Sequence, residues 1–292
     1  MPGKKLLFRI LRYSGILKHL NITIKTYVNN RKVLIPMVNG IGFDNYVNPG
    51  DSWMLFVLNS LYHNSLFDGS FIDVGVNIGQ TLIKVKAIDP TINYIGFEPN
   101  PFCINYVNRL IEINNYDKTR ILPVAISNKT SISTLQLYYQ SNVDSTASMI
   151  RGFRKKASVK RTIDVPVFKF SDITFKDPFK ISILKIDVEG GELEVLESFI
   201  ELIRSDEPII LIEILPAYSI ENSLRIERQE KIRKLLEEMG YYIFRVLKQK
   251  DKYHQIQQIS KFDIHADLNL CDYILAPDSK ADLLSATMAK MT

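Results

Sequence analysis

The sequence predicts an α/β fold: a doubly wound, mostly parallel sheet of seven strands with an antiparallel edge strand, preceded by a helix and a hairpin. Three observations lead to this prediction. From residue 70 onward, short apolar segments alternate with longer segments of helical periodicity. Near-continuous apolar strands indicate a parallel sheet that helices cover on both faces. The last two strand segments have no helix between them, so we expect them to pair antiparallel at one edge.

The first part of the chain predicts an appendage. A basic amphipathic helix, a hairpin and an apolar helix are expected there, over 4–20, 22–43 and 52–62. The hairpin would turn at Asn29 and Asn30, and Ser52 is a candidate N-cap. We therefore divide the chain into an appendage, 1–67, and a main domain, 68–292.

The main domain predicts regular alternation with one interruption. Its strands are expected at 70–75, 94–98, 121–127, 182–188, 209–214, 241–246 and 271–276. Its helices are expected before Pro90 and at 102–114, 191–204 and 225–239. An insertion at about 128–172 contains two strand-like stretches, 132–139 and 163–170.

The composition is that of a globular protein. The 292 residues are 46% hydrophobic and 24% charged, which excludes disordered, collagen-like and disulfide-stapled classes. Cys103 and Cys271 lie far apart without metal-ligand spacing. No segment reaches the ~20 apolar residues of a membrane helix, and Arg9 and Arg12 interrupt a signal-peptide core. We therefore expect a cytoplasmic protein.

The formal charge of +5 is unevenly distributed. Residues 1–43 contain eight Lys or Arg and no acid, so a helix over 1–20 is a candidate for peripheral contact with an anionic membrane. The insertion carries a second basic cluster: Arg151, Arg154, Lys155, Lys156, Lys160 and Arg161. This cluster is either a solvated loop or a lid that attracts an acidic acceptor. Because it is short, nucleic acid is not the expected partner.

The turn after the first main-domain strand, FIDVGVNIG, is typical of a ligand site. Gly75 and Gly79 let a ligand approach the backbone, and the next helix offers free amides. Asn77 replaces the middle glycine of the GxGxxG motif, and Asp73 adds negative charge, so a sulfonium or ammonium group suits this turn better than a diphosphate. Glu98, at the end of the second strand, is placed to bind ribose hydroxyls. Together they predict a nucleoside site; a glycine turn without a ligand and a solvated Glu98 are the alternatives.

The fourth strand, within LKIDVEGGE, carries an unusual number of charges. Lys185, Asp187 and Glu189 alternate along it and so point to one side. Charges on an interior strand cost free energy unless they are paired or functional. Glu213 adds an acid at the end of the next strand. The cluster is either catalytic or a structural ion-pair network.

These segments together resemble the FkbM family of S-adenosylmethionine-dependent methyltransferases, in the class I Rossmann-like group, over about residues 68–276. The resemblance rests on six segments in order: FIDVGVNIG, GFEPNP, PVAIS, STAS, LKIDVEGGE and LIEI. Val76 and Gly191 stand where the family usually has alanine.

The resemblance implies S-adenosyl-L-methionine as cofactor and O-methylation of a hydroxyl group on a sugar, a glycan or a secondary metabolite. The residues implied around the methionine part are Asp73, Gly75, Asn77 and Gly79. Glu98 would bind the ribose, and Ala125 and Ser127 would lie near the adenine. The candidate acceptor-binding residues are Ser145, Arg151 and Glu189.

In-line methyl transfer requires an aligned and deprotonated acceptor oxygen. Asp187 is the first candidate for the general base and Glu213 the second, with Lys185 holding the carboxylates or binding the acceptor. Asp187, Glu189 and Glu213 are alternatively an oxygen-ligand set for a divalent cation. Two other functions stay open: a metal-dependent glycosyltransferase using a nucleotide sugar, and a non-catalytic membrane or partner adaptor on the same fold.

Overall fold

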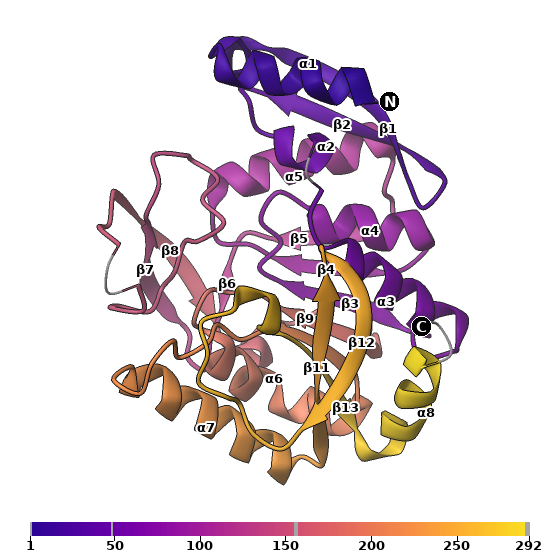
Figure 1. Ribbon diagram of the computed structural model, residues 1–292, viewed down its shortest axis with the longest axis vertical. Helices are drawn as coiled ribbons and strands as arrows, with labels where there is room; N and C mark the ends of the chain where they lie inside the picture. Colours follow the sequence, from indigo (N-terminus) through magenta and orange to yellow (C-terminus); the bar gives the residue numbers. More distant parts are fainter. Residues whose placement is uncertain (1, 48, 155–156, 290–292) are drawn as a thin grey trace.

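The computed structural model describes residues 2–47, 49–154 and 157–289 and has an eight-stranded sheet at its centre (Figure 1). The strand order is β12-β11-β13-β10-β9-β3-β4-β5. The strands are β3 (Ser70–Val74), β4 (Tyr94–Phe97), β5 (Thr119–Leu122), β9 (Ile181–Ile186), β10 (Ile209–Glu213), β11 (Tyr241–Gln249), β12 (Lys252–Ile259) and β13 (Asp272–Pro277). The five strands from β10 to β5 in this order are parallel to one another. The predicted mostly parallel sheet is confirmed.

The antiparallel side of the sheet differs from the prediction. β13 pairs with β10 on one side and β11 on the other, so the antiparallel strand lies inside the sheet. The edge is formed by β12, an eighth strand that follows β11 through a tight turn at Lys250 and Asp251, both with positive φ. In β12 a register shift opposite Leu247 and Lys248 brings the partly buried Tyr253 and Ile256 to one face and into one hydrophobic core, whereas Ile259 packs against the core on the other face.

The predicted strand over 121–127 is divided into two. Pro123 has no amide hydrogen and therefore interrupts the ladder after Leu122. Ala125 and Ile126 then pair with the insertion and not with the central sheet. The second, three-stranded sheet consists of β6 (Ala125–Ile126), β8 (Arg161–Phe168) and β7 (Ser131–Leu137).

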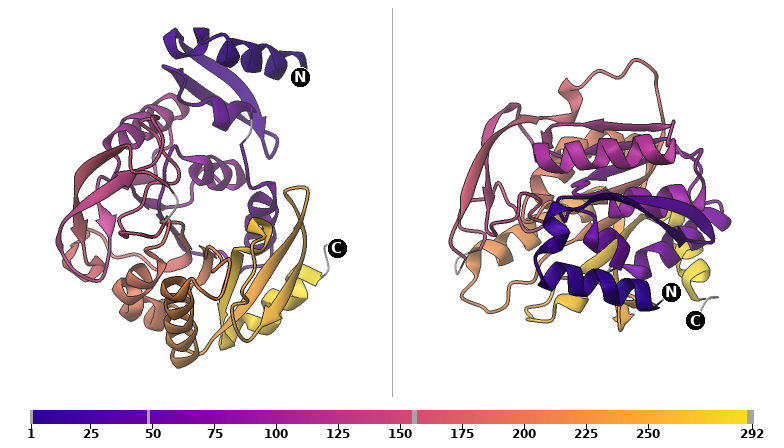
Figure 2. Two further views of the ribbon diagram at one scale, coloured as in Figure 1. Left: turned by 60° about the vertical axis from the view of Figure 1, so that its left-hand side comes forward. Right: turned by 90° about the horizontal axis from the view of Figure 1, so that it is seen from above.

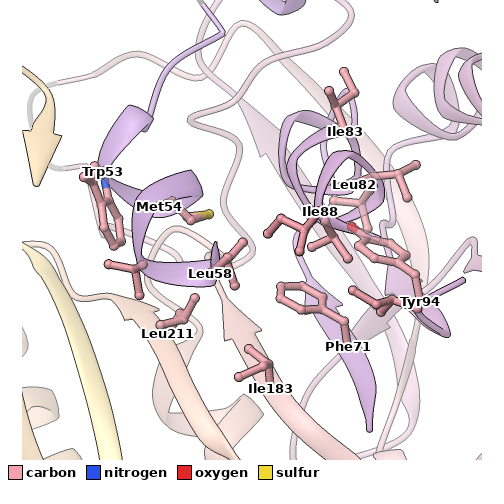
Figure 3. Close-up of a cluster of buried hydrophobic side chains, with 14 of the residues drawn as sticks. Trp53, Met54, Leu58, Phe71, Leu82, Ile83, Ile88, Tyr94, Ile183 and Leu211 are labelled. Carbon is pink, nitrogen blue, oxygen red and sulfur yellow. The ribbon is translucent and has the colours of Figure 1, made fainter. Parts of the chain in front are cut away.

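Helices cover both faces of the central sheet, as predicted for a doubly wound fold. One face carries α3 (Ser52–His63), α4 (Gln80–Ile88), α5 (Pro101–Asn114) and α8 (Asp278–Ala289); the other carries α6 (Glu192–Asp206) and α7 (Ser223–Glu238). Side chains alternate along the strands, so Phe71 joins the first core and Ile72 the second. Figure 3 shows the first core, where side chains of α3 and α4 meet Phe71, Ile183 and Leu211 of the sheet. The sequence pattern had not predicted α8.

The appendage has the predicted order of elements, with a shorter first helix. It consists of α1 (Pro2–Tyr13), the short 3-10 helix η1 (Ile16–His19), β1 (Asn21–Val28), β2 (Arg31–Val38) and α2 (Phe43–Val47). The helix predicted over 4–20 ends early because Gly15 adopts a left-handed conformation with φ 72°. The hairpin turns at Asn29 and Asn30, with φ 48° and 61°, as predicted.

The capping role predicted for Ser52 is wrong. Asp51 occupies the N-cap position of α3 in a left-handed conformation. The Ser52 hydroxyl instead donates to the carbonyl of Asp251, in the turn between β11 and β12.

The hairpin is fixed onto α5. The Asn114 side chain accepts a hydrogen bond from the Leu34 amide at 2.8 Å and donates one to the Leu34 carbonyl at 2.7 Å. Ile35 and Met37 are buried in the same core as α3 and α4. A division of the chain after residue 67 stays a prediction, because this core runs across it. Within the described ranges, no helix combines the length and apolar character needed to cross a bilayer.

Candidate functional site

A pocket of about 240 Å³ lies beyond the carboxyl ends of β3, β4, β9 and β10, where open α/β sheets bind ligands. Most of the predicted site residues line it: Gly75, Asn77, Glu98, Ala125, Ser145, Lys185, Asp187, Glu189 and Glu213. Four other predicted residues, all in the described part of the chain, lie outside its lining: Asp73, Gly79, Ser127 and Arg151.

The glycine turn after β3 is shaped by contact with the turn after β9. Gly75 has φ 95°, and a Cβ there would lie 1.9 Å from the carbonyl oxygen of Asp187. A side chain at this position is therefore excluded. Gly79, with φ 77°, serves packing instead, because its Cβ would lie 2.9 Å from Leu110 of α5. Asn77, between the two glycines, also has a positive φ, 49°.

Asp73 lies behind the pocket wall. It is fully buried and accepts hydrogen bonds from the Tyr94 hydroxyl and from Lys185 Nζ, the latter at 3.1 Å. Lys185 also donates to the Gly75 carbonyl at 3.3 Å and forms an ion pair with Asp187 at 3.3 Å. Burial alone would lower the pKa of Lys185, but the two carboxylates outweigh burial and raise that pKa above its ordinary value. Asp73 thus positions a charged Lys185.

The two candidate bases lie in different environments. The Asp187 side chain is 40% exposed and is in contact with the charged Lys185. Glu213 is partly buried, and desolvation together with the charges of Asp187 and Asp272 raises its pKa well above the ordinary value. The Cys271 thiol donates to Glu213 Oε1 at 3.3 Å. The Asp187 carboxylate is therefore accessible to a ligand hydroxyl from the pocket, whereas the raised pKa of Glu213 favours its protonated form, which donates a hydrogen bond.

Glu98 has a carboxylate that the backbone holds in place. Its Oε2 accepts from the Asn77 amide at 2.7 Å, and its Oε1 accepts from the Asn100 amide at 2.8 Å. Burial raises the pKa of Glu98 to about 7 despite these two amides. Each carboxylate oxygen has a second lone pair, so Glu98 can also accept hydrogen bonds from hydroxyl groups in the pocket.

The insertion forms one wall of the pocket, through Ser145, Ala147 and Met149. Arg154 fixes this wall to the turn after β9, because its guanidinium lies 2.5 Å from the Glu189 carboxylate. The Ser148 hydroxyl donates to the Glu189 carbonyl at 2.6 Å. Burial raises the pKa of Glu189 to about 7, with the Asp187 charge adding to the effect.

A second contact holds the insertion at Gly190. This glycine has φ 108°, and a Cβ on it would lie 2.7 Å from the Phe153 ring. Arg225 of α7 lies over the same ring at 4.2 Å and donates to the Phe153 carbonyl at 3.1 Å. The insertion is therefore packed against the site at this point. Arg151 is exposed, and Lys155 and Lys156 lie outside the described residues.

Asp144 is a pocket residue that the sequence argument missed. Its carboxylate accepts hydrogen bonds from the amides of Tyr138, Tyr139 and Thr146 and from the Thr146 hydroxyl. It fixes the loop that carries Ser145. The Asp-x-Thr spacing is typical of an Asx turn and was the available signal.

A smaller pocket of about 140 Å³ adjoins the first. The two share Asp51, Lys185, Asp187 and Glu213. Trp53, Lys248 and Asp272 also line the smaller pocket, and Lys248 forms an ion pair with Asp272. Burial raises the pKa of Asp272 to about 6. The indole nitrogen of Trp53 is buried and has no hydrogen-bond partner among the described residues. Sequence spacing could not reveal this pocket, because α3, β11 and β13 come together only in the fold.

The acids do not form a metal site in this geometry. Within the described residues, no group of three or more His, Cys, Asp or Glu side chains is arranged to hold a metal ion. The alternative ligand set of Asp187, Glu189 and Glu213 therefore has no support from side-chain positions.

The sheet order, with β13 inserted between β10 and β11, and the pocket at the ends of β3 and β4 define the class of the protein: a Rossmann-like α/β fold with a ligand site at the carboxyl ends of its parallel strands. The comparison with family models is more specific. The Methyltransferase FkbM domain matches residues 73–243, more than half of the chain. The chain belongs to this family.

The individual proteins to which the chain is similar have low sequence identity to it. Methyltransferase sdnD of Sordaria araneosa is 27% identical over 205 residues, which cover 60% of this chain and 74% of that protein. Methyltransferase 1 of Beauveria bassiana (strain ARSEF 2860) is 27% identical over 144 residues, 44% of this chain and 58% of that protein. The crystal structure of methyltransferase FkbM from Methylobacillus flagellatus KT aligns with 14% identity and a TM-score of 0.44, over 75% of this chain and 47% of that one. The chain thus spans less than two thirds of the second relative and of the solved structure.

Proposed function

We propose that this protein transfers the methyl group of S-adenosyl-L-methionine to a hydroxyl oxygen of a small acceptor, as an O-methyltransferase. The observation that carries the proposal is the position of Asp187. It is a partly exposed carboxylate, held by Lys185, at the junction of two pockets. One pocket has the features of a nucleoside site, and the other has room for an acceptor.

The larger pocket fits the cofactor through its own chemistry. Glu98 offers two carboxylate oxygens to ribose hydroxyls, and its backbone partners keep them in place. The turn at Gly75 and Asn77 brings backbone to the pocket wall without a side chain at its tightest point. Ala125 and Ile126 supply an apolar surface for a base. When bound, S-adenosylmethionine supplies an electrophilic methyl group on a sulfonium.

Asp187 would orient the acceptor hydroxyl and take its proton. Proton transfer from a hydroxyl oxygen to a positioned carboxylate typically increases the rate of a reaction by 10²–10⁴-fold. Lys185 keeps Asp187 in one place through the 3.3 Å ion pair, and Asp73 in turn fixes Lys185. Protonated Glu213 would donate a hydrogen bond to a second acceptor oxygen from the same pair of pockets.

The smaller pocket favours a hydroxylated acceptor such as a sugar, a glycan end or a polyol-bearing metabolite. It combines an aromatic residue, Trp53, with a carboxylate and an ammonium group, Asp272 and Lys248. Such groups both donate to and accept from hydroxyls. Charge on the acceptor is not needed, because Lys248 is already paired with Asp272.

The test is calorimetric binding of S-adenosylmethionine and its demethylated product to wild type and Glu98→Ala, followed by a tritium-methyl transfer screen over sugars and polyols. We expect saturable binding by the wild type and at least a tenfold loss in the variant, since one or two charge-assisted hydrogen bonds are removed. Absence of binding by a folded wild type, or equal binding by both proteins, would overturn the assignment of the larger pocket. Transfer to a carbon or nitrogen acceptor alone would overturn O-methylation.

A further inference from the structure

The first helix, α1, has two faces with opposite roles. Figures 1 and 2 show it at the outer end of the molecule, with the β1–β2 hairpin between it and α5. Its inner face is docked at three positions. Lys5 donates to the Val47 carbonyl at 3.3 Å, Phe8 meets Tyr46 edge to face at 5.2 Å, and Arg12 forms a 3.2 Å ion pair with Asp44.

The opposite face of α1 is apolar and uncovered. We define this outer face as Leu6, Leu7, Ile10 and Tyr13, which are 58%, 52%, 55% and 92% exposed. Positions 6, 10 and 13 follow the helical repeat, so they form one stripe. Three large apolar side chains and a tyrosine in one contiguous stripe indicate a surface that meets an apolar partner.

The charges beside this stripe select the partner. Lys4 and Arg9 are exposed on α1, and no ion pair to either is present among the described residues. Lys18 is exposed on the following η1. The first acid of the chain is Asp44, which already pairs with Arg12. A second copy of this face would place like charges together, whereas an anionic lipid surface would neutralise them.

We propose that the outer face of α1 docks the protein on an anionic lipid bilayer, with Leu6, Ile10 and Tyr13 inserted at the level of the headgroups and Lys4, Arg9 and Lys18 beside them. A basic helix with a strong apolar face and low overall hydrophobicity lies in the bilayer interface and does not cross it. This inference goes beyond the proposed methyl transfer and does not rest on it.

The helix α1 lies next to a second pocket that connects to the candidate site. A pocket of about 390 Å³ lies beneath the end of α1 and η1, and its lining includes Arg12 and Lys18. This pocket shares Asp144 and Ser145 with the larger site pocket. Because Arg12 and its partner Asp44 lie on the inner side of α1, docking through the outer face would hold this pocket and the larger site pocket behind the membrane-bound helix.

The test is cosedimentation of the full chain with vesicles of phosphatidylcholine containing phosphatidylglycerol, and with vesicles of pure phosphatidylcholine. We expect binding to the first vesicles only, weakening as salt rises. The double variant Leu6→Ser/Ile10→Ser should lose about tenfold or more in affinity, because two inserted side chains are removed. Its matched control is Ile132→Ser/Ile220→Ser, which removes two isoleucines that are 71% and 74% exposed elsewhere on the molecule and should bind like wild type.

Three results would overturn the proposal: no binding of wild type to anionic vesicles, equal binding to both vesicle types, or unchanged binding by Leu6→Ser/Ile10→Ser. Light scattering of the same proteins without lipid tests the alternative that the outer face binds a second copy of this chain. A dimer that Leu6→Ser/Ile10→Ser dissociates would assign the outer face to self-association instead. All four substituted side chains are exposed, so we expect both double variants to keep the wild-type Tm, which circular dichroism checks.

Discussion

Lys185 and Asp73 are direct neighbours across two parallel strands, and their side chains form a buried ion pair with Nζ and Oδ1 3.1 Å apart. Asp73 is fully buried, and Lys185 is 5% exposed. Lys185 then reaches forward to Asp187 at the pocket. The buried Asp73 thus fixes Lys185, and Lys185 in turn fixes the Asp187 carboxylate at the carboxyl end of β9.

The first prediction concerns the stability of this pair. Lys185→Met should lower the free energy of unfolding by about 3–5 kcal/mol, because it leaves the Asp73 carboxyl buried without its cation. Urea denaturation measures the loss. The matched control is Lys231→Met, which removes an exposed pair with Glu227 and should cost no more than about 0.5 kcal/mol. Adding Asp73→Asn to Lys185→Met should restore part of the loss; equal costs for the two lysine variants would show that the buried pair is not stabilising.

The second prediction separates the two candidate bases. Asp187→Asn should lower kcat by about 10²–10⁴-fold with unchanged affinity for S-adenosylmethionine, because only proton transfer is removed. Glu213→Gln should change kcat by less than about tenfold, because glutamine replaces a protonated acid as a hydrogen-bond donor. Single-turnover methyl transfer to an acceptor that the wild type methylates measures both. A larger effect at Glu213 than at Asp187 would reverse the assigned roles.

The fold could be predicted from the sequence where the hydrophobic periodicity of each segment matches the strand or helix that it forms. Apolar strands such as β9 and amphipathic helices such as α6 have one consistent periodicity, so their order and the parallel sheet followed from sequence. β12 was missed because its tyrosine and isoleucines stand among polar residues, and only the hairpin with β11 makes it a strand. The insertion point of β13 was missed because strand order depends on long-range pairing, which periodicity does not encode.

The site was predictable to the extent that it is local in sequence. The turn at Gly75, the acid Glu98 and the cluster around Asp187 each end a strand, and parallel strands bring such ends to one edge. The sequence predicts that Asp73 contacts the cofactor, whereas the structure buries it behind Lys185. Sequence spacing could not reveal this position, because it depends on the register between β3 and β9. Trp53 and Lys248 come from elements outside that edge, and no spacing links them.

The third prediction is a pH dependence of stability. The pKa of Glu98 is raised to about 7 in the folded protein, from an unfolded value near 4.5. Between these values the folded state binds more protons than the unfolded state, so the contribution of Glu98 to stability is present below about pH 4.5 and is lost as pH rises through 7. Glu98→Gln removes this dependence. Urea denaturation at about pH 5 and 8 should show wild type losing up to about 3 kcal/mol more than Glu98→Gln; parallel losses would contradict the raised pKa.

The last prediction tests whether the insertion is held at the pocket by the contact of Phe153 with Gly190. Gly190→Ala would place a Cβ 2.7 Å from the Phe153 ring at a φ of 108°, so the ring must move or the backbone must change. The matched control is Gly240→Ala, which has φ 71° and open space around the Cβ. The control should cost about 1 kcal/mol for its backbone alone, and Gly190→Ala about 2–4 kcal/mol, because overpacking adds to the strain.

The two glycine variants also differ in what they do to the pocket. Displacing Phe153 loosens the wall that carries Met149, so Gly190→Ala should also weaken cofactor binding and speed limited proteolysis between residues 145 and 163, whereas Gly240→Ala should change neither. If Gly190→Ala costs no more stability than Gly240→Ala and leaves proteolysis unchanged, the insertion does not depend on Phe153, and the Arg154–Glu189 ion pair would be its main attachment.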